Sequence, residues 1–248
     1  MPTQSRASPV PLLLTRPEPQ AADFARQAQA QFGDKVRIIV TPVLAPRFYA
    51  PVLPGGPFAG LILTSQTGVA AYLRLGAAKE GLPRDVYCVG LRTADAARAA
   101  GLRAIAIAPD AAGLTDQIKA AGPTGALLHL RGREVRGNIV GHLNSAGIDT
   151  KEAVIYAQEQ QTLATEAEAA LQDRRPVLVP LFSPRSAAVF ASELARIEGI
   201  SPLFVAAMSS EVATALGTKP ARIRIAGTPD ADAMLVTLTL LFADMQRA

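Results

Sequence analysis

Four junctions between predicted strands and helices carry small polar residues that could bind anions. A Ser or Thr at a helix start accepts a hydrogen bond from a backbone amide of the first turn. The free amides and partial positive charge of a helix start also bind carboxylates and phosphates. One such junction is typical of an ordinary helix cap, but four at equivalent places indicate a shared anion-binding cleft. The junctions are Thr64-Ser65-Gln66-Thr67-Gly68, Gly90-Leu91-Arg92-Thr93, Ser183-Pro184-Arg185-Ser186 and Met208-Ser209-Ser210-Glu211.

Arginines follow several of the same strands. Arg16, Arg92 and Arg185 come just after predicted strands, and Arg47 lies in a predicted linker. The densest basic segment is residues 131–136, RGREVR. A guanidinium group can donate two parallel hydrogen bonds to one carboxylate. This segment is therefore either a solvated run of charge or a flexible basic loop that faces a polycarboxylate.

Tyr156 is the one residue that stands out as a candidate for catalysis. It is a phenol at the expected end of a strand, at a crossover between domains, although a half-buried strand aromatic would look the same. The sequence has no GxSxG elbow, no Walker loop and no GxGxxG after a strand, so serine-hydrolase and nucleotide sites have little support. His129 and His142 lack the cysteine partners of a typical zinc site, because the single cysteine, Cys88, lies in an apolar run.

The composition is that of a globular protein with a mild basic excess. Of the 248 residues 49% are hydrophobic, and the net charge is +4. That charge is too small to indicate a nucleic-acid partner, but it suits a small polyanion if the basic residues converge. The run Leu12-Leu13-Leu14 is too short for a signal peptide or membrane span. We therefore expect a cytoplasmic protein with no membrane partner.

Short apolar runs alternate with alanine-rich helical patterns along the chain. The alternation predicts parallel sheets covered by helices, and the continuous apolar strands are typical of sheets buried on both faces. Helices are expected at 18–32, up to 75, up to 100 and over the C-terminal apolar stretch 233–243. Strands are expected at 12–15, 36–40, 58–63, 86–89 and 104–107.

The chain also repeats itself in the same order with small insertions. Residues 12–16, LLLTR, match 127–131, LLHLR, and the strand ending at Thr41 matches one ending at Tyr156. The junction at Ser65 matches that at Ser183, and the Gly90 junction matches the Ser209 junction. The repeat predicts two similar α/β domains. Extended linkers are expected near 41–46, where two prolines disfavour helix, and near 155–160.

Taken together, these segments resemble the uroporphyrinogen-III synthase family across nearly the whole chain. The motifs that carry the resemblance are Leu13-Leu14-Thr15-Arg16-Pro17, Ile62-Leu63-Thr64-Ser65, Val86-Tyr87-Cys88-Val89-Gly90, Leu130-Arg131-Gly132, Val154-Ile155-Tyr156 and Phe182-Ser183-Pro184. The resemblance implies two flavodoxin-like lobes with parallel sheets, joined by a two-stranded linker. Lobe 1 would be discontinuous, 1–41 plus 159–248, and lobe 2 would be 44–156.

The resemblance further implies an enzyme of haem biosynthesis that needs no cofactor and no metal. Its substrate, hydroxymethylbilane, carries eight carboxylates, loses water and closes with inversion of ring D through a spiro intermediate. Tyr156 matches the family's proposed catalytic tyrosine. A monomer is expected, with transient contact to the preceding pathway enzyme. The expected substrate-binding residues are Arg16, Thr64, Ser65, Gln66, Gly90, Thr93, Arg131, Gly132, Ser183, Arg185, Ser209 and Ser210.

The junction Ser209-Ser210-Glu211-Val212-Ala213 departs from the family pattern of a glycine followed by Thr-Ala. The threonine hydroxyl is missing, and Glu211 adds an anion near the expected carboxylate site. Two other interpretations of the chain stay open. One is a two-lobed binding or sensory protein for a small anionic ligand, which the linkers and the anion-binding junctions suit equally. The other is a degenerate family member kept for protein–protein contacts.

Overall fold

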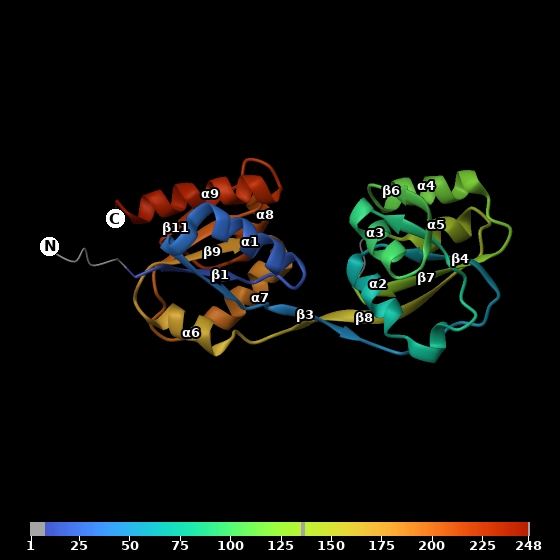
Figure 1. Ribbon diagram of the computed structural model, residues 1–248, viewed down its shortest axis with the longest axis horizontal. Helices are drawn as coiled ribbons and strands as arrows, with labels where there is room; N and C mark the ends of the chain where they lie inside the picture. The colour runs from blue at the N-terminus through green and yellow to red at the C-terminus, as the bar shows by residue number, and fades with distance from the viewer. Residues whose placement is uncertain (1–7, 135–136, 248) are drawn as a thin grey trace. The chain divides into compact units, whose positions relative to one another are not determined.

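The computed structural model describes residues 8–134 and 137–247. The chain divides into two compact units, Met1–Ala45 with Gln160–Ala248 (unit 1) and Pro46–Glu159 (unit 2) (Figure 1). Each unit is a mostly parallel sheet with helices on both faces. This confirms the expected α/β class.

Unit 1 has a five-stranded parallel sheet in the order β11-β10-β9-β1-β2. Numbered along the unit, the order is 2-1-3-4-5, the flavodoxin-like arrangement. The strands are β1 (Val10–Leu14), β2 (Val36–Val40), β9 (Val177–Leu181), β10 (Leu203–Ala207) and β11 (Arg222–Ile225). The helices are α1 (Gln20–Phe32), α6 (Thr165–Gln172), α7 (Pro184–Leu194), α8 (Ser210–Ala215) and α9 (Ala231–Met245), with a 3₁₀ turn, η1 (Gly33–Lys35).

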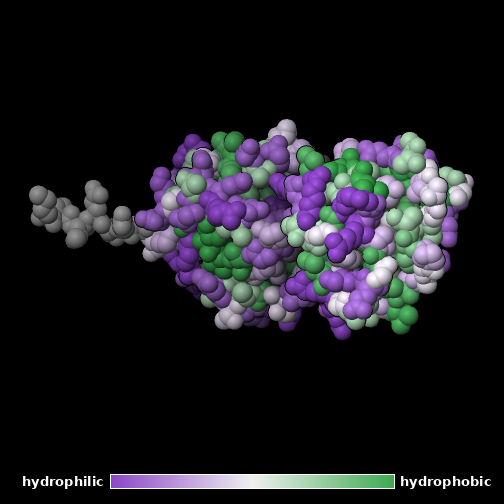
Figure 2. Space-filling model, turned by 45° about the vertical axis from the view of Figure 1, so that its right-hand side comes forward, coloured by the Kyte–Doolittle hydropathy of each residue, from purple (hydrophilic) through white to green (hydrophobic). Residues whose placement is uncertain are grey.

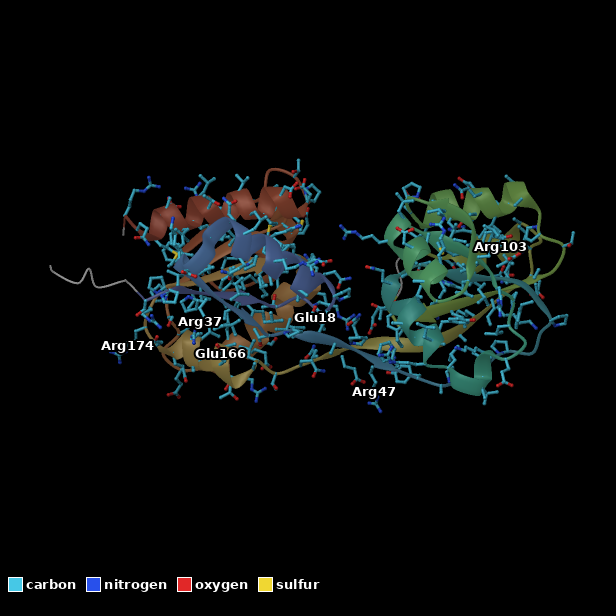
Figure 3. The ribbon with its side chains drawn as sticks, viewed as in Figure 1. Glu18, Arg37, Arg47, Arg103, Glu166 and Arg174 are labelled. Carbon is cyan, nitrogen blue, oxygen red and sulfur yellow. The ribbon has the colours of Figure 1, made fainter. Side chains whose placement is uncertain are left out.

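The core of unit 1 lies on both faces of this sheet because its central strands are apolar at every position. In β1, Leu12 and Leu14 pack with Phe24 of α1 on one face, and Leu13 packs with Phe190 of α7 on the other. Arg37 of β2 and Glu166 of α6 point toward each other at 3.4 Å (Figure 3). The fully buried leucines explain why the sequence shows a continuous apolar run here and no alternation.

Unit 2 has a six-stranded sheet in the order β3-β8-β7-β4-β5-β6. Its strands are β3 (Leu44–Phe48), β4 (Phe58–Leu63), β5 (Asp85–Val89), β6 (Arg103–Ala108), β7 (Ala126–Gly132) and β8 (Thr150–Gln160). Its helices are α2 (Gln66–Leu73), α3 (Leu91–Ala99), α4 (Ala111–Ala121) and α5 (Ile139–Ser145), with a 3₁₀ turn, η2 (Gly76–Lys79). Helices α2 and α3 cover one face, and α4 and α5 cover the other.

The two sheets have the same neighbour order once the repeat is applied. If β7 is set equal to β1, and β8, β4 and β5 to β2, β9 and β10, the order β8-β7-β4-β5-β6 reproduces that of unit 1. The chain enters the second copy at a different strand, so the units are circular permutations of one plan. The predicted duplication of an α/β unit is therefore visible in the topology.

Two extended segments carry the chain between the units. β3 and β8 are hydrogen-bonded neighbours in one sheet, and the amide of Tyr49 donates to the carbonyl of Ile155 at 2.8 Å. The strand expected to end at Tyr156 continues to Gln160, so Tyr156 lies inside β8. That prediction of a strand end was wrong because the added pairing with β3 extends the strand.

Two predicted helix bounds also differ from the structure. Helix α1 begins at Gln20, after Pro17 and Pro19, because the residue before a proline is disfavoured in the helical region. Helix α2 ends at Leu73, and the 3₁₀ turn η2 follows.

The surface mixes polar and apolar residues, and hydrophilic groups predominate on the face that Figure 2 shows. No helix in residues 8–134 and 137–247 is long and apolar enough to cross a membrane. Cys88 is buried and free. Burial raises the pKa of its thiol to about 11, which makes this side chain an unreactive part of the core.

Candidate functional site

A cavity of about 570 Å³ lies in unit 2 at the carboxyl ends of its parallel strands. Its walls come from the ends of β4, β5, β6 and β7, from the middle of β8 and from the starts of α4 and α5. The centre of this edge is the gap between β7 and β4, where the strand order reverses. Open α/β sheets bind their ligands at such a switch point, so the cavity is the candidate site.

Ser65 and Tyr156 meet in this cavity. Ser65 follows β4 and caps α2, because its Oγ accepts a hydrogen bond from the amide of Gly68 at 2.9 Å. The same Oγ lies 2.8 Å from the phenol oxygen of Tyr156. The tyrosine is only 9% exposed, so the capping serine fixes the position of a mostly buried phenol.

Gly132 makes room for that phenol. A Cβ added at Gly132 would lie 2.7 Å from Cζ and 2.9 Å from the oxygen of Tyr156. These are distances that a real side chain does not tolerate. The glycine at the end of β7 is therefore required for Tyr156 to reach Ser65.

Arg131 lines the same cavity as Ser65 and Tyr156, and its side chain is paired with Glu152. Its Nε and Nη2 donate to the two carboxylate oxygens at 2.8 and 2.6 Å. Its Nη1 donates to the carbonyl of Gly132 at 3.0 Å. The hydrogen bond from Arg131 holds the pKa of Glu152 below its usual range. Both groups are therefore ionised, and we call this bidentate pair the Arg131–Glu152 clasp.

His129 lies in the floor of the cavity. It is 4% exposed, and neither ring nitrogen has a hydrogen-bond partner. Burial lowers the pKa of His129 to about 4, against a smaller raising effect of Glu152 and a further lowering by Arg131. The ring is therefore neutral near pH 7 and leaves two unsatisfied polar atoms beside the clasp.

Sequence reasoning did not select His129 or Glu152 for the site. The signal for His129 was its position as a polar residue inside the apolar run of residues 127–130. Glu152 carried no signal of its own, because only the register of β7 against β8 makes it the strand neighbour of His129.

The structure brings together five of the predicted site residues in the unit 2 cavity. They are Thr64, Ser65, Arg131, Gly132 and Tyr156. Gln66, Gly90 and Thr93 belong to the same edge but are outside the lining. Gly90 caps α3 with a φ of +79°, and Thr93 is buried in that helix. Of the predicted basic loop, Val135 and Arg136 lie outside the described residues, and Arg133 donates to the phenol oxygen of Tyr49 at 2.7 Å.

The remaining predicted residues gather on the equivalent edge of unit 1. Arg16 follows β1, Ser183 follows β9 and Ser209 caps α8 after β10, and these three strands are neighbours in the sheet. The guanidinium of Arg16 lies 4.1 Å from the centre of the Phe182 ring. Arg185 and Ser210 lie in the first turns of α7 and α8.

The two serine caps of unit 1 differ in their hydrogen bonds. Ser183 Oγ accepts from the amide of Ser186 at 3.2 Å and lies 2.7 Å from the Ser186 hydroxyl. Ser209 Oγ accepts from Val212 at a longer 3.4 Å. Hydrogen bonds from the Ser209 hydroxyl, from its own backbone amide and from the Ser210 hydroxyl lower the pKa of Glu211, with Ser209 the largest cause. The departure noted at this junction therefore places a stable negative charge at the start of α8.

The described residues hold no group of three or more His, Cys, Asp or Glu side chains that could bind a metal. The acidic groups of the cavity are already engaged. Asp110 caps α4 by accepting from Gly113 at 2.8 Å, Glu134 accepts from the amide of Gln158 at 3.3 Å, and Glu152 is in the clasp.

These features define a two-unit protein of flavodoxin-like topology with a polar ligand site at the switch point of a parallel sheet. Residues 36–236 match the family model described as Uroporphyrinogen-III synthase HemD, and the chain belongs to this family of haem-biosynthesis enzymes.

A solved structure agrees with this fold. The chain is similar to uroporphyrinogen-III synthetase from Helicobacter pylori at 20% identity, with a TM-score of 0.62 over 94% of this chain and 99% of that one. It also matches a mutant uroporphyrinogen III synthase from Thermus thermophilus at 14% identity and a TM-score of 0.47, over 95% and 99%. No curated protein sequence matches the chain.

Proposed function

We propose that this chain is the uroporphyrinogen-III synthase that converts hydroxymethylbilane to the macrocycle with ring D inverted. The proposal rests on membership of the family and on one observation within unit 2. That observation is a buried phenol, Tyr156, held by Ser65 in a cavity at the sheet's switch point. The reaction makes it a lyase that removes water.

The chemistry begins with departure of the substrate's hydroxyl group, which needs a proton to leave as water. Tyr156 is the proposed donor of that proton, and Ser65 keeps its phenol in place. The azafulvene left behind is attacked at the substituted carbon of ring D, which gives a spiro intermediate. Fragmentation and reclosure then give the inverted ring. A positioned general acid contributes about 10²–10⁴-fold to such a step.

The larger task of the protein is to hold a flexible polyacid so that the hindered carbon reacts first. Helix starts and guanidinium groups are suited to the eight carboxylates. In unit 2 these are the start of α2 and Arg131, and in unit 1 the start of α7 and Arg16. We propose that both edges contact the substrate.

The experiment is incubation of the purified chain with freshly made hydroxymethylbilane, followed by separation of the product isomers. The type III isomer supports the proposal. Formation of only the spontaneous type I isomer would leave a binding protein or an inactive family member.

We further propose that the chain acts as a monomer in the cytoplasm and makes transient contact with the enzyme that supplies its unstable substrate. A single buried thiol suits a reducing compartment. Sedimentation at micromolar concentration tests the monomer, since a dimer would double the mass.

A further inference from the structure

The Arg131–Glu152 clasp and His129 form one cluster on a single face of the unit 2 sheet. His129 and Glu152 are direct neighbours across β7 and β8. Arg131 follows His129 by two residues and so points to the same face. All three line the cavity. The side chain of Arg131 is 17% exposed and that of Glu152 is 41% exposed, so the clasp can be reached from the cavity.

The cluster contains a bidentate ion pair and a buried histidine ring without hydrogen-bond partners. Arg131 already has the bidentate carboxylate partner that it was expected to find in a ligand. His129 has no partner for either ring nitrogen. A buried polar group without a hydrogen bond destabilises the fold, and such groups are few in native proteins. An arrangement in which Glu152 turned from Arg131 to His129 would give one of the two ring nitrogens a hydrogen-bond partner.

We propose that Glu152 pairs with Arg131 only while no ligand is bound. When a tetrapyrrole binds, one of its carboxylates replaces Glu152 on Arg131, and the released Glu152 accepts a hydrogen bond from His129. The inference rests on the proposed function, since it requires a polycarboxylate ligand. It assigns Glu152 and His129 as positioning residues that act through Arg131.

The exchange balances in charge and hydrogen bonds. One ligand carboxylate enters, and Arg131 keeps a bidentate partner. His129 takes one proton from solvent and donates a hydrogen bond to Glu152. The other charged groups lining the described part of the cavity are Asp110 and Glu134. Both are carboxyl groups. The exchange gives the ring a carboxylate partner, which raises its pKa from about 4, so binding should take up a proton at pH values above about 4.

Variants at the two cluster positions and a control outside the cavity separate this exchange from a structural role. Glu152→Gln removes the competing charge with little change in shape. His129→Phe fills the buried space without polar atoms, and His129→Asn serves if the Phe variant does not fold. Asp85→Asn is the matched control, because Asp85 forms a bidentate pair with Arg103 in the same unit, and neither residue lines the cavity.

The measurements use uroporphyrin III, an octacarboxylate, as the probe. Its affinity is read from fluorescence titration, and proton uptake is read from calorimetry in two buffers of different ionisation enthalpy. We expect Glu152→Gln to bind about tenfold more tightly, as one charge-assisted hydrogen bond accounts for such a factor. We expect His129→Phe to bind about tenfold more weakly, because the released Glu152 is then unpaired.

Proton uptake should be present in the wild type and in Asp85→Asn, and absent in both cluster variants. The double variant should bind like Glu152→Gln, because His129 has no task once Glu152 is gone. Unchanged affinity in Glu152→Gln, or ligand binding by the wild type without proton uptake, overturns the exchange. A wild type that neither binds the probe nor forms the type III isomer contradicts the proposed function itself.

Discussion

Tyr156 is held on two sides. Ser65 Oγ lies 2.8 Å from its hydroxyl, and Gly132 allows the ring to approach the end of β7. A phenol fixed in this way gives up little rotational freedom when a substrate arrives, and a positioned proton donor depends on such pre-organisation.

We expect Tyr156→Phe to lower the rate of type III product formation by about 10²-fold, because the proton donor is lost while the ring is kept. Isomer-resolved kinetics measures this effect. Tyr49→Phe is the control, since Tyr49 bonds to Arg133 and does not line the cavity. Equal turnover of Tyr156→Phe and wild type removes Tyr156 from the mechanism.

We expect Gly132→Ala to reduce both activity and stability. Its Cβ would overlap the Tyr156 ring at 2.7 Å, and overpacking of this kind costs about 1–3 kcal/mol. Denaturant unfolding and turnover measure the two effects. Gly55→Ala, where nothing lies within 4 Å of the added Cβ, should leave both unchanged.

His129 predicts a specific dependence of stability on pH. Its pKa is about 4 in the fold against 6.5 as the ordinary value, so the unfolded chain binds the proton more tightly. The neutral ring's contribution is complete above about pH 6.5 and is lost as the pH falls toward 4. Roughly 2 kcal/mol should disappear between pH 7 and pH 5. Urea unfolding at both values tests this, and His129→Phe should lack that loss.

The N-termini of three helices hold predicted site residues. The cap residues Ser65, Ser183 and Ser209 each accept a hydrogen bond from their own helix, and they follow β4, β9 and β10. The apolar runs and the cap chemistry are local properties, so the sequence could predict the strands, the helix starts and the serines between them.

The contacts within the site could not be predicted in the same way. The closeness of His129 and Glu152 depends on the register of β7 against β8, and the approach of Tyr156 to Ser65 depends on β8 continuing to Gln160. Register is set by pairing across long separations in sequence. Residue spacing alone therefore gave the clasp no signal.

We expect Ser183→Ala to cost about 1 kcal/mol of stability, as the loss of a helix cap does, and also to weaken binding of uroporphyrin III. Asp230→Ala is the matched control. Asp230 caps α9 by accepting from Ala233 at 2.8 Å, but it follows the edge strand β11. Denaturant unfolding should show a loss of stability in both variants. Ligand titration should show a loss of affinity for uroporphyrin III only in Ser183→Ala.

The whole molecule is one plan used twice with the starting strand changed. Unit 1 reads 2-1-3-4-5 along its sheet, and unit 2 reads the same order after permutation. The sequence predicted two linkers, one from its prolines and one around Tyr156. These segments belong to β3 and β8, which are neighbours in one sheet. Duplication explains why predicted ligand residues occur at matching strand ends in both units.

Because the chain enters unit 2 at a different strand, unit 2 is one continuous segment, residues 46–159, inserted into unit 1. At the insertion point, the amide of Gln161 donates to the carbonyl of Val43 at 2.9 Å, so the two segments of unit 1 are adjacent where the insertion begins and ends. Deleting the stretch and closing the gap with two or three glycines should leave a cooperative five-stranded protein. The excised stretch should fold as a separate product. Cooperative thermal unfolding of each half would establish that they are independent modules, and a molten half would show that it needs the other to fold.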